Sequence, residues 1–275
     1  MGKTLRFDSP SFGRRLKGML GVDFYRLFHT PMYYIFLAIA AIIPAMILGT
    51  SGIPDPQTGV AATPLYTNVW HIIAAEEPLY VVSDIAEYAN MDMVFIFGGI
   101  MVSIFIGHDY KSGYVKQLFT THPKKQDYMM SKTITCAFAM ACMCVTYLIG
   151  AVAAGLLTGG SFQVDPLALL CAVLGKMIMS LGWASLYTFL NIIFRKYFGV
   201  SIASSFFFGT GILIIGAAAI VGNSAWLNVF LYGSSVYACL SSTPVTVLVC
   251  LVCSVVWALV YNVLGTRILS KCDVY

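Results

Sequence analysis

The chain has 275 residues, of which 59% are hydrophobic and only 10% are charged, and its mean hydropathy is +0.83. A soluble domain is about 45–50% apolar and about 25% charged, so the 16 Lys and Arg with 12 Asp and Glu of this chain cannot cover a soluble globule. The same values exclude intrinsic disorder, and a net charge of +4 without long basic runs argues against a nucleic-acid partner, which leaves a membrane protein.

Residues 11–29 have the spacing of an amphipathic helix placed before the first apolar run. Apolar side chains recur every three or four residues, and we expect the charged side chains largely on the opposite face. The apolar positions are Phe12, Leu16, Met19, Leu20, Phe24, Leu27 and Phe28, and the charged positions are Arg14, Arg15, Lys17, Asp23 and Arg26. Such a helix is expected in the cytoplasmic membrane interface. Alternatively, residues 1–30 are only the solvated flank of the first span.

Six apolar runs are long enough to cross a bilayer, which needs about 20 helical residues. The predicted spans are residues 31–50, 91–108, 134–158, 167–194, 198–222 and 245–265. They are continuously apolar, whereas barrel strands alternate, so we predict an all-α fold with one transmembrane domain over residues 1–275. The first span is expected to be an uncleaved signal anchor, because its run is long enough to cross the membrane.

The segment 51–90, predicted on the outer side, is first rich in proline and then acidic and aromatic. A loop of about forty residues without structure of its own is uncommon, so we expect a small ordered element, helical around residues 81–88. Its acidic side chains are suited to steer a cationic ligand. They also follow from the charge asymmetry of membrane topology, which we favour.

The segment 109–132, between the second and third spans, is the most informative part of the chain. Lys111–Thr121 predicts a short amphipathic helix that ends before Pro123. Its apolar residues are Tyr114, Val115, Leu118 and Phe119. Exposed aromatic side chains on a cytoplasmic helix need a protein to cover them, which predicts docking of a soluble partner.

The fourth span carries one charge and a polar-aromatic stripe. Lys176 interrupts the apolar run; it either snorkels to the outer interface, which we favour, or contacts a substrate inside the membrane. The stripe consists of Ser180, Trp183, Tyr187 and Asn191, which share one helical face. These residues line a substrate path or a dimer seam, or they belong to the lipid interface, where aromatic side chains gather.

Residues 223–243 are apolar but too broken by Gly233, Ser234 and Ser235 to span the membrane alone. We expect two short helices that dip into the outer leaflet, with any non-helical backbone buried in protein. An ordinary membrane-surface loop is the alternative.

The basic residues predict the orientation of the spans. Fifteen of the sixteen Lys and Arg lie in residues 1–30, in the segments after the second and fourth spans, and at the end of the chain. The other side carries seven acidic residues, counting Asp92 at the edge of the second span, and its loops hold no Lys or Arg. Both termini are therefore expected in the cytoplasm, and we expect a multi-pass protein of a bacterial plasma membrane.

The sequence offers no catalytic set. All four histidines lie in loops or at span ends, and the phosphate-binding pattern GxxxxGK[ST] does not occur. We expect no enzyme activity, metal or cofactor on this chain, so any ATP would be hydrolysed on another subunit.

A set of positions after the second span follows a recognisable order: an acid, a glycine, an apolar pair, a proline with basic neighbours and a lysine at the next span. These positions are Asp109, Gly113, Leu118, Phe119, Pro123, Lys124, Lys125 and Lys132. They resemble the signature region of permease subunits of ABC-2 type transporters, which usually have Glu at the first position and Arg after the turn. The layout is also similar, with an interfacial helix, six spans and a re-entrant stretch before the last span.

The resemblance implies a type V exporter-like bundle in which segment 109–132 contains the coupling helix. The implied coupling residues are Asp109, Gly113, Tyr114, Leu118, Phe119, Pro123, Lys124 and Lys125. The permease would pair with a second permease subunit, identical or different, and with ATPase subunits that bind ATP and Mg²⁺. It would export an amphipathic or hydrophobic cargo, with a peptide favoured, through the dimer interface. The alternative, from another class, is a membrane receptor, scaffold or peptide-immunity protein that binds its ligand through residues 51–90.

Overall fold

A computed structural model describes residues 11–51, 85–121, 124–157, 161–211, 225–240 and 242–271. This part of the chain is predominantly helical and contains no strand. The helices are α1 (Phe12–Phe28), α2 (Pro31–Ser51), α4 (Ile85–Lys111), α5 (Tyr114–Thr121), α6 (Lys125–Leu157), α7 (Pro166–Ile193), α8 (Phe198–Gly209), η1 (Ala225–Val229), α10 (Leu231–Leu240) and α11 (Pro244–Lys271). The all-α prediction is confirmed for these residues.

Four helices are long and apolar enough to cross a membrane, namely α4, α6, α7 and α11. They coincide with the predicted second, third, fourth and sixth spans. The predicted first span corresponds to α2, which is bent by 66° from α1, and the two helices meet the same criterion as a pair. The predicted fifth span begins as α8, and its remainder after Gly211 lies outside the described residues. The structure thus has four such helices in its described part, or five with the bent pair.

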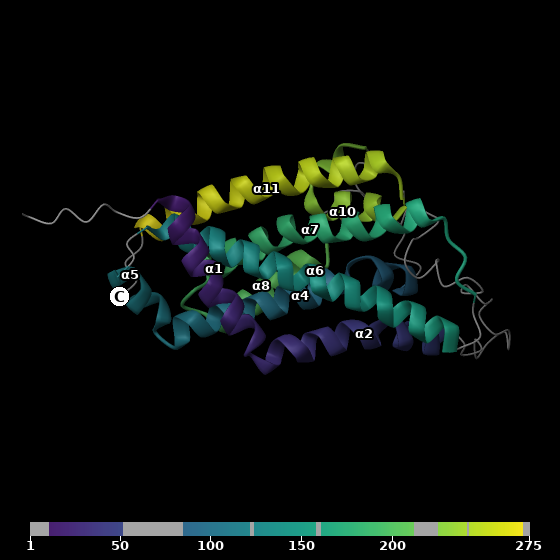
Figure 1. The fold of residues 1–275 in the computed structure, drawn as a ribbon, viewed down its shortest axis with the longest axis horizontal. Coiled ribbons are helices and arrows are strands. Elements are labelled where there is room, and N and C mark those ends of the chain that lie inside the picture. The colour runs from purple at the N-terminus through teal and green to yellow at the C-terminus, as the bar shows by residue number, and fades with distance from the viewer. Residues whose placement is uncertain are drawn as a thin grey trace, which may run out of the picture.

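The elements form one elongated bundle (Figure 1). Helix α7 packs against α11 on one side and α6 on the other, α2 packs along α6, and α8 packs against α4. The largest fully buried side chains of the bundle include Phe95, Met101, Trp183 and Tyr187. Since each long helix buries a stripe against two or more neighbours, the bundle has a continuous core.

One glycine allows the closest approach of two long helices. A side chain at Gly150 of α6 would collide with the backbone carbonyl oxygen of Ala41 in α2. Small residues are enriched where helix backbones meet in membrane proteins, because packing rather than water drives their association. Gly150 therefore lets α2 lie directly against α6.

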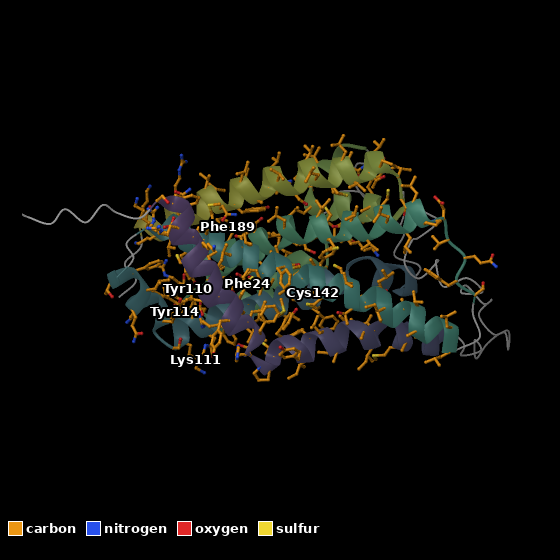
Figure 2. All side chains as sticks on the ribbon, viewed as in Figure 1. Phe24, Tyr110, Lys111, Tyr114, Cys142 and Phe189 are labelled. Carbon is orange, nitrogen blue, oxygen red and sulfur yellow. The ribbon has the colours of Figure 1, made fainter. Side chains whose placement is uncertain are left out.

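Helix α1 is a separate helix that crosses α6 at one end of the bundle (Figure 1), not a straight extension of the first span. Its apolar spacing is confirmed by Phe24 (labelled in Figure 2), whose ring packs on Phe138 of α6 with centroids 5.2 Å apart. The expected placement of its charges is wrong for Asp23, which is only 1% exposed. The signal was present in the sequence, because Asp23 lies four residues after Met19 and four before Leu27, which places all three on one helical face.

Two short helical elements occupy the stretch before the last long helix. The 3-10 helix η1 and helix α10 follow each other, and α10 packs on α7, α11 and α4. The prediction of two short helices in residues 223–243 is confirmed for residues 225–240. Their depth relative to a membrane stays a prediction.

The segments assigned to the cytoplasm by their basic residues gather at one end of the bundle. This end holds α1, α5 and the last turns of α11, which lie together on the left in Figure 1. Helix α7 begins at the opposite end, where the carboxylate of Asp165 caps it by accepting a hydrogen bond from the Ala168 amide. In the segment 51–90, helix α4 begins at Ile85, and residues 52–84 lie outside the described residues.

Candidate functional site

The turn between α4 and α5 positions the first residue of the family-like pattern. Helix α4 ends at Lys111, and Gly113 has a φ of 74°, a left-handed backbone conformation that residues other than glycine rarely adopt. Asp109 lies just before this turn and is fully buried. The chain thus turns from α4 into α5 at a glycine four residues after a buried carboxylate.

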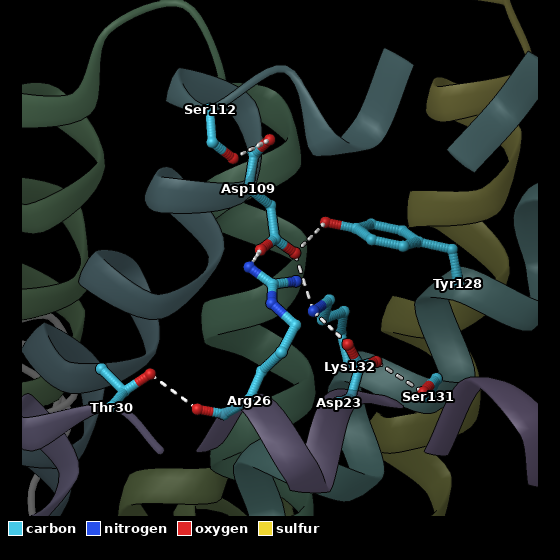
Figure 3. Close-up of polar contacts among 8 residues, drawn as sticks. All are labelled: Asp23, Arg26, Thr30, Asp109, Ser112, Tyr128, Ser131 and Lys132. Carbon is cyan, nitrogen blue, oxygen red and sulfur yellow. Dashed lines mark hydrogen bonds and ion pairs between the residues drawn. The ribbon is translucent and has the colours of Figure 1, made fainter. Parts of the chain in front are cut away.

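Four charged side chains from three helices meet around Asp109 (Figure 3). The Nζ of Lys132 in α6 lies 2.7 Å from Oδ2 of Asp109 and 2.6 Å from Oδ1 of Asp23 in α1. Nη2 of Arg26, also in α1, donates to Oδ1 of Asp109 at 2.5 Å. We call Asp23, Arg26, Asp109 and Lys132 the charge cluster. Its two acids and two bases balance.

Neutral groups supply further hydrogen bonds to the two carboxylates of the charge cluster, whereas Nη1 of Arg26 is buried without a hydrogen-bond partner among the described residues. The Ser131 hydroxyl donates to Oδ2 of Asp23 at 2.6 Å, and the Tyr128 hydroxyl donates to Oδ2 of Asp109 at 3.3 Å. Both carboxylates therefore bond through both oxygens. A buried charge is tolerated when it is paired and its remaining hydrogen-bonding capacity is met.

Aromatic rings line the charge cluster on the side of α5. The Arg26 guanidinium lies 4.3 Å from the ring centroid of Tyr114, and the Lys132 ammonium lies 4.6 Å from that of Phe105. Burial alone would lower the pKa of Arg26, but the carboxylate of Asp109 outweighs it and raises that pKa further. Burial raises the pKa of the Tyr114 phenol, with Asp23 adding to the effect, so the ring faces the cations as a neutral phenol.

The charge cluster joins three helices that are far apart in sequence. Removing one partner from a buried ion pair costs about 3–5 kcal/mol, because the other charge stays buried without compensation. Arg15 of α1 adds a second link to α6, with its Nε 2.7 Å from Oδ2 of Asp127. Helix α1 is thus held to the bundle by two groups of ion pairs in addition to its apolar contacts.

The apolar face of α5 is covered by the chain itself, which corrects the expectation that it is exposed. Val115 is buried, and Tyr114, Leu118 and Phe119 are half-buried. Phe119 packs edge-on against Tyr128 with centroids 5.5 Å apart. The rest of the surrounding cluster consists of Met129, Ile192 and Leu269. The face of α5 that is left for a partner is the opposite one, with Lys116, Gln117 and Thr120 exposed.

The basic residues after α5 divide into one that points inward and one that points outward. Lys125 Nζ donates to the carbonyl oxygen of Leu269 at 2.7 Å and so ties the start of α6 to the end of α11. Lys124 is exposed. Pro123, also predicted as a coupling residue, lies outside the described residues.

The stripe on α7 faces the inside of the bundle. Ser180, Trp183, Tyr187 and Asn191 are all at most 2% exposed, so they do not lie at a lipid interface. Trp183 Nε1 donates to Ser235 Oγ of α10 at 2.8 Å. The Asn191 side chain donates to Ser103 Oγ of α4 at 3.0 Å and to Tyr187 O at 2.8 Å, and it accepts from Ser201 of α8. These hydrogen bonds fix the position of α7 relative to α4, α8 and α10. A role of the stripe in a substrate path or dimer seam stays a prediction.

Lys176 is half-buried between α6 and α7. Its ammonium lies 5.9 Å from the ring centroid of Tyr147. With Tyr147 and Cys144 it lines a small cavity at this junction. Its two predicted alternatives, snorkelling and substrate contact, both stay open to test.

Sequence reasoning missed the burial of Lys132, which was recognised only as the residue before the third span. Lys132 is fully buried, so Lys176 is not the chain's single charge within the bundle. No one-dimensional pattern joins Lys132 to Asp23, because 109 positions separate them. No known protein-family model matches this chain, and no curated protein matches its sequence.

Proposed function

We propose that this chain is the transmembrane permease subunit of an ATP-driven ABC-2 type exporter, with ATP bound and hydrolysed on separate subunits. One observation carries the proposal: the amphipathic helices α1 and α5 lie at the same end of the bundle and converge on the charge cluster. A transporter that receives force from a soluble ATPase needs a short surface helix connected rigidly to its long helices. Helix α5 with its two-residue turn fits this need.

The charge cluster supplies the rigid connection. Asp109 precedes α5 by one turn of helix and bonds Arg26 of α1 and Lys132 of α6. A partner that displaces α5 would therefore transmit force to α1, α4 and α6 together. Packed interfaces shift between discrete arrangements rather than deforming continuously, which suits a transport cycle.

The proposed partner surface is the exposed side of α5. It carries the cation Lys116 with the polar residues Gln117 and Thr120. An ATPase surface with an acidic rim would complement it, whereas the residues predicted from the family pattern, Leu118 and Phe119, hold α5 to the bundle.

The remaining features of the proposal follow the sequence and its resemblance. The chain would have six spans with both termini in the cytoplasm of a bacterial cell and would act as a homo- or heterodimer. The cargo would be amphipathic or hydrophobic, with a peptide favoured, and would leave through the dimer interface.

The test is affinity purification of the full chain from its native membrane in mild detergent, followed by measurement of ATP hydrolysis in the purified fraction. We expect co-purified ATPase activity, and its loss on Lys116→Glu by charge repulsion. Lys196→Glu is the matched control, because Lys196 is also exposed but follows α7 rather than lying on α5. If the wild-type fraction lacks ATPase activity, the exporter proposal is wrong and a receptor or scaffold takes its place.

A further inference from the structure

A groove of about 440 Å³ runs between α6, α7 and α11, away from the charge cluster. The part of the groove farther from the basic end is apolar, with Ile134, Leu181 and Val255. Its lower part carries polar side chains, with Gln126 of α6 and Arg267 of α11 at the basic end of the bundle. Polarity therefore changes along the groove axis, from hydrocarbon-like to cationic.

The length of the groove matches one leaflet of a membrane. Val255 and Arg267 are separated by 12 positions of continuous helix, which is about 18 Å along the axis of α11. Half of the hydrocarbon core of a bilayer is about 15 Å thick. An acyl chain along the apolar wall would thus have its headgroup at the level of Arg267.

The charges around the lower end fit an anion. Arg267 is exposed and forms no ion pair within the described residues, and Lys124 and Lys271 are exposed at the same end. Asp127 of α6 is next in sequence to Gln126, which lines the groove, but its carboxylate is already paired with Arg15. Halfway along, the Thr133 hydroxyl donates to Oδ1 of Asn262 at 3.2 Å and joins α6 to α11.

We propose that this groove binds one phospholipid with an anionic headgroup, with an acyl chain on the apolar wall and the phosphate at Arg267. Basic pockets between membrane helices on the cytoplasmic side recognise anionic headgroups in this way. A second copy of the chain is a poorer occupant. Its own basic end would lie at the same membrane level, and like charges would face each other across the groove. The site does not depend on the exporter function.

Native mass spectrometry of the purified full chain tests the site, with phosphatidylglycerol and phosphatidylcholine of identical acyl chains as probes. We expect phosphatidylglycerol to bind about fivefold more tightly, the effect of one basic residue near an anionic headgroup. Arg267→Gln should bring the two affinities together. Arg195→Gln, which removes a cation that lines a different cavity at the same end, should leave the preference unchanged.

A second pair of variants tests occupancy without touching charge. Val255→Trp places bulk into the groove from an exposed rim position and should lower the binding of both lipids. Val256→Trp, at the next position outside the groove, should not. A phosphatidylglycerol preference that survives Arg267→Gln overturns the proposal. So does a shift from dimer to monomer caused by Val255→Trp, which would make the groove a contact between copies.

Discussion

Two groups of buried polar side chains hold the helices of this bundle in register, and they differ in charge. The charge cluster at the basic end consists of four ionised groups from α1, α4 and α6. The stripe on α7 is neutral, and its indole and amide form hydrogen bonds with hydroxyl groups of α4, α8 and α10. Both groups are buried except for Arg26, whose side chain is 24% exposed.

The difference teaches where each kind of polar group is tolerated. A buried charge carries a desolvation cost of several kcal/mol, so it persists only with a complete set of partners. A buried neutral amide or hydroxyl that lacks a hydrogen bond lowers the stability by about 1–3 kcal/mol. Such a group can therefore hold helices in position inside the bundle with fewer hydrogen bonds. Loss of one member should therefore disrupt the whole charge cluster, whereas the stripe on α7 can lose one hydrogen bond at a time.

Removal of the central cation should break this comparison most strongly. Lys132→Met leaves Asp23 without its ion pair, and we expect a loss of about 3–5 kcal/mol of stability, measured as the thermal midpoint of the detergent-solubilised protein. Asp23→Asn in the same chain should restore part of the loss, because it removes the uncompensated carboxylate. Lys176→Met is the control, and an equal loss there would mean that the charge cluster is not special.

Loss of the amide in the neutral stripe should have a smaller effect. Asn191→Leu leaves the Ser201 hydroxyl without its acceptor, while Ser103 keeps its contact with Ser205. We expect a loss of about 1–3 kcal/mol in the same thermal assay. Ser204→Ala serves as the control, because that hydroxyl bonds only to Ser201 O within its own helix. A loss as large as that of Lys132→Met would contradict the distinction between charged and neutral groups.

Removal of a single bond from the stripe should have the smallest effect. Trp183→Phe loses the 2.8 Å hydrogen bond to Ser235 but keeps stacked contacts with Phe95 and Tyr187. We expect a loss of about 0.5–1.5 kcal/mol. Ser235→Ala should add little in the Trp183→Phe background, since both changes remove the same bond. Fully additive losses would show that the bond contributes nothing.

The two groups were accessible to sequence reasoning to different degrees. The stripe on α7 was recognised as one face, because Ser180, Trp183, Tyr187 and Asn191 recur at helical spacing within one span. The charge cluster was not recognised, although Asp109 and Lys132 were singled out. Asp23 was assigned to the polar face of α1 despite its spacing from Met19 and Leu27.

Helix α5 shows the same limit of sequence-based prediction, in this case for an apolar helix face. Its amphipathic pattern was read correctly as a short helix between two long ones. The pattern shows which face is apolar but not what covers it, and the cover is Tyr128 and Met129 of α6 with Leu269 of α11. The surface left for a partner is therefore opposite to the one expected.

The sequence by itself determined the helical class, the location of the long apolar helices and the gathering of basic residues at one end. Hydrophobic runs and charge bias are properties of local composition, and they need no knowledge of neighbours. Only the tertiary structure decided which charges are buried, which face of α5 is free and where a groove opens between α6, α7 and α11. These features depend on contacts between different helices, some of them between residues more than a hundred positions apart, such as Asp23 with Lys132. The energy of a buried charge depends on its partners, and only the folded bundle brings those partners together.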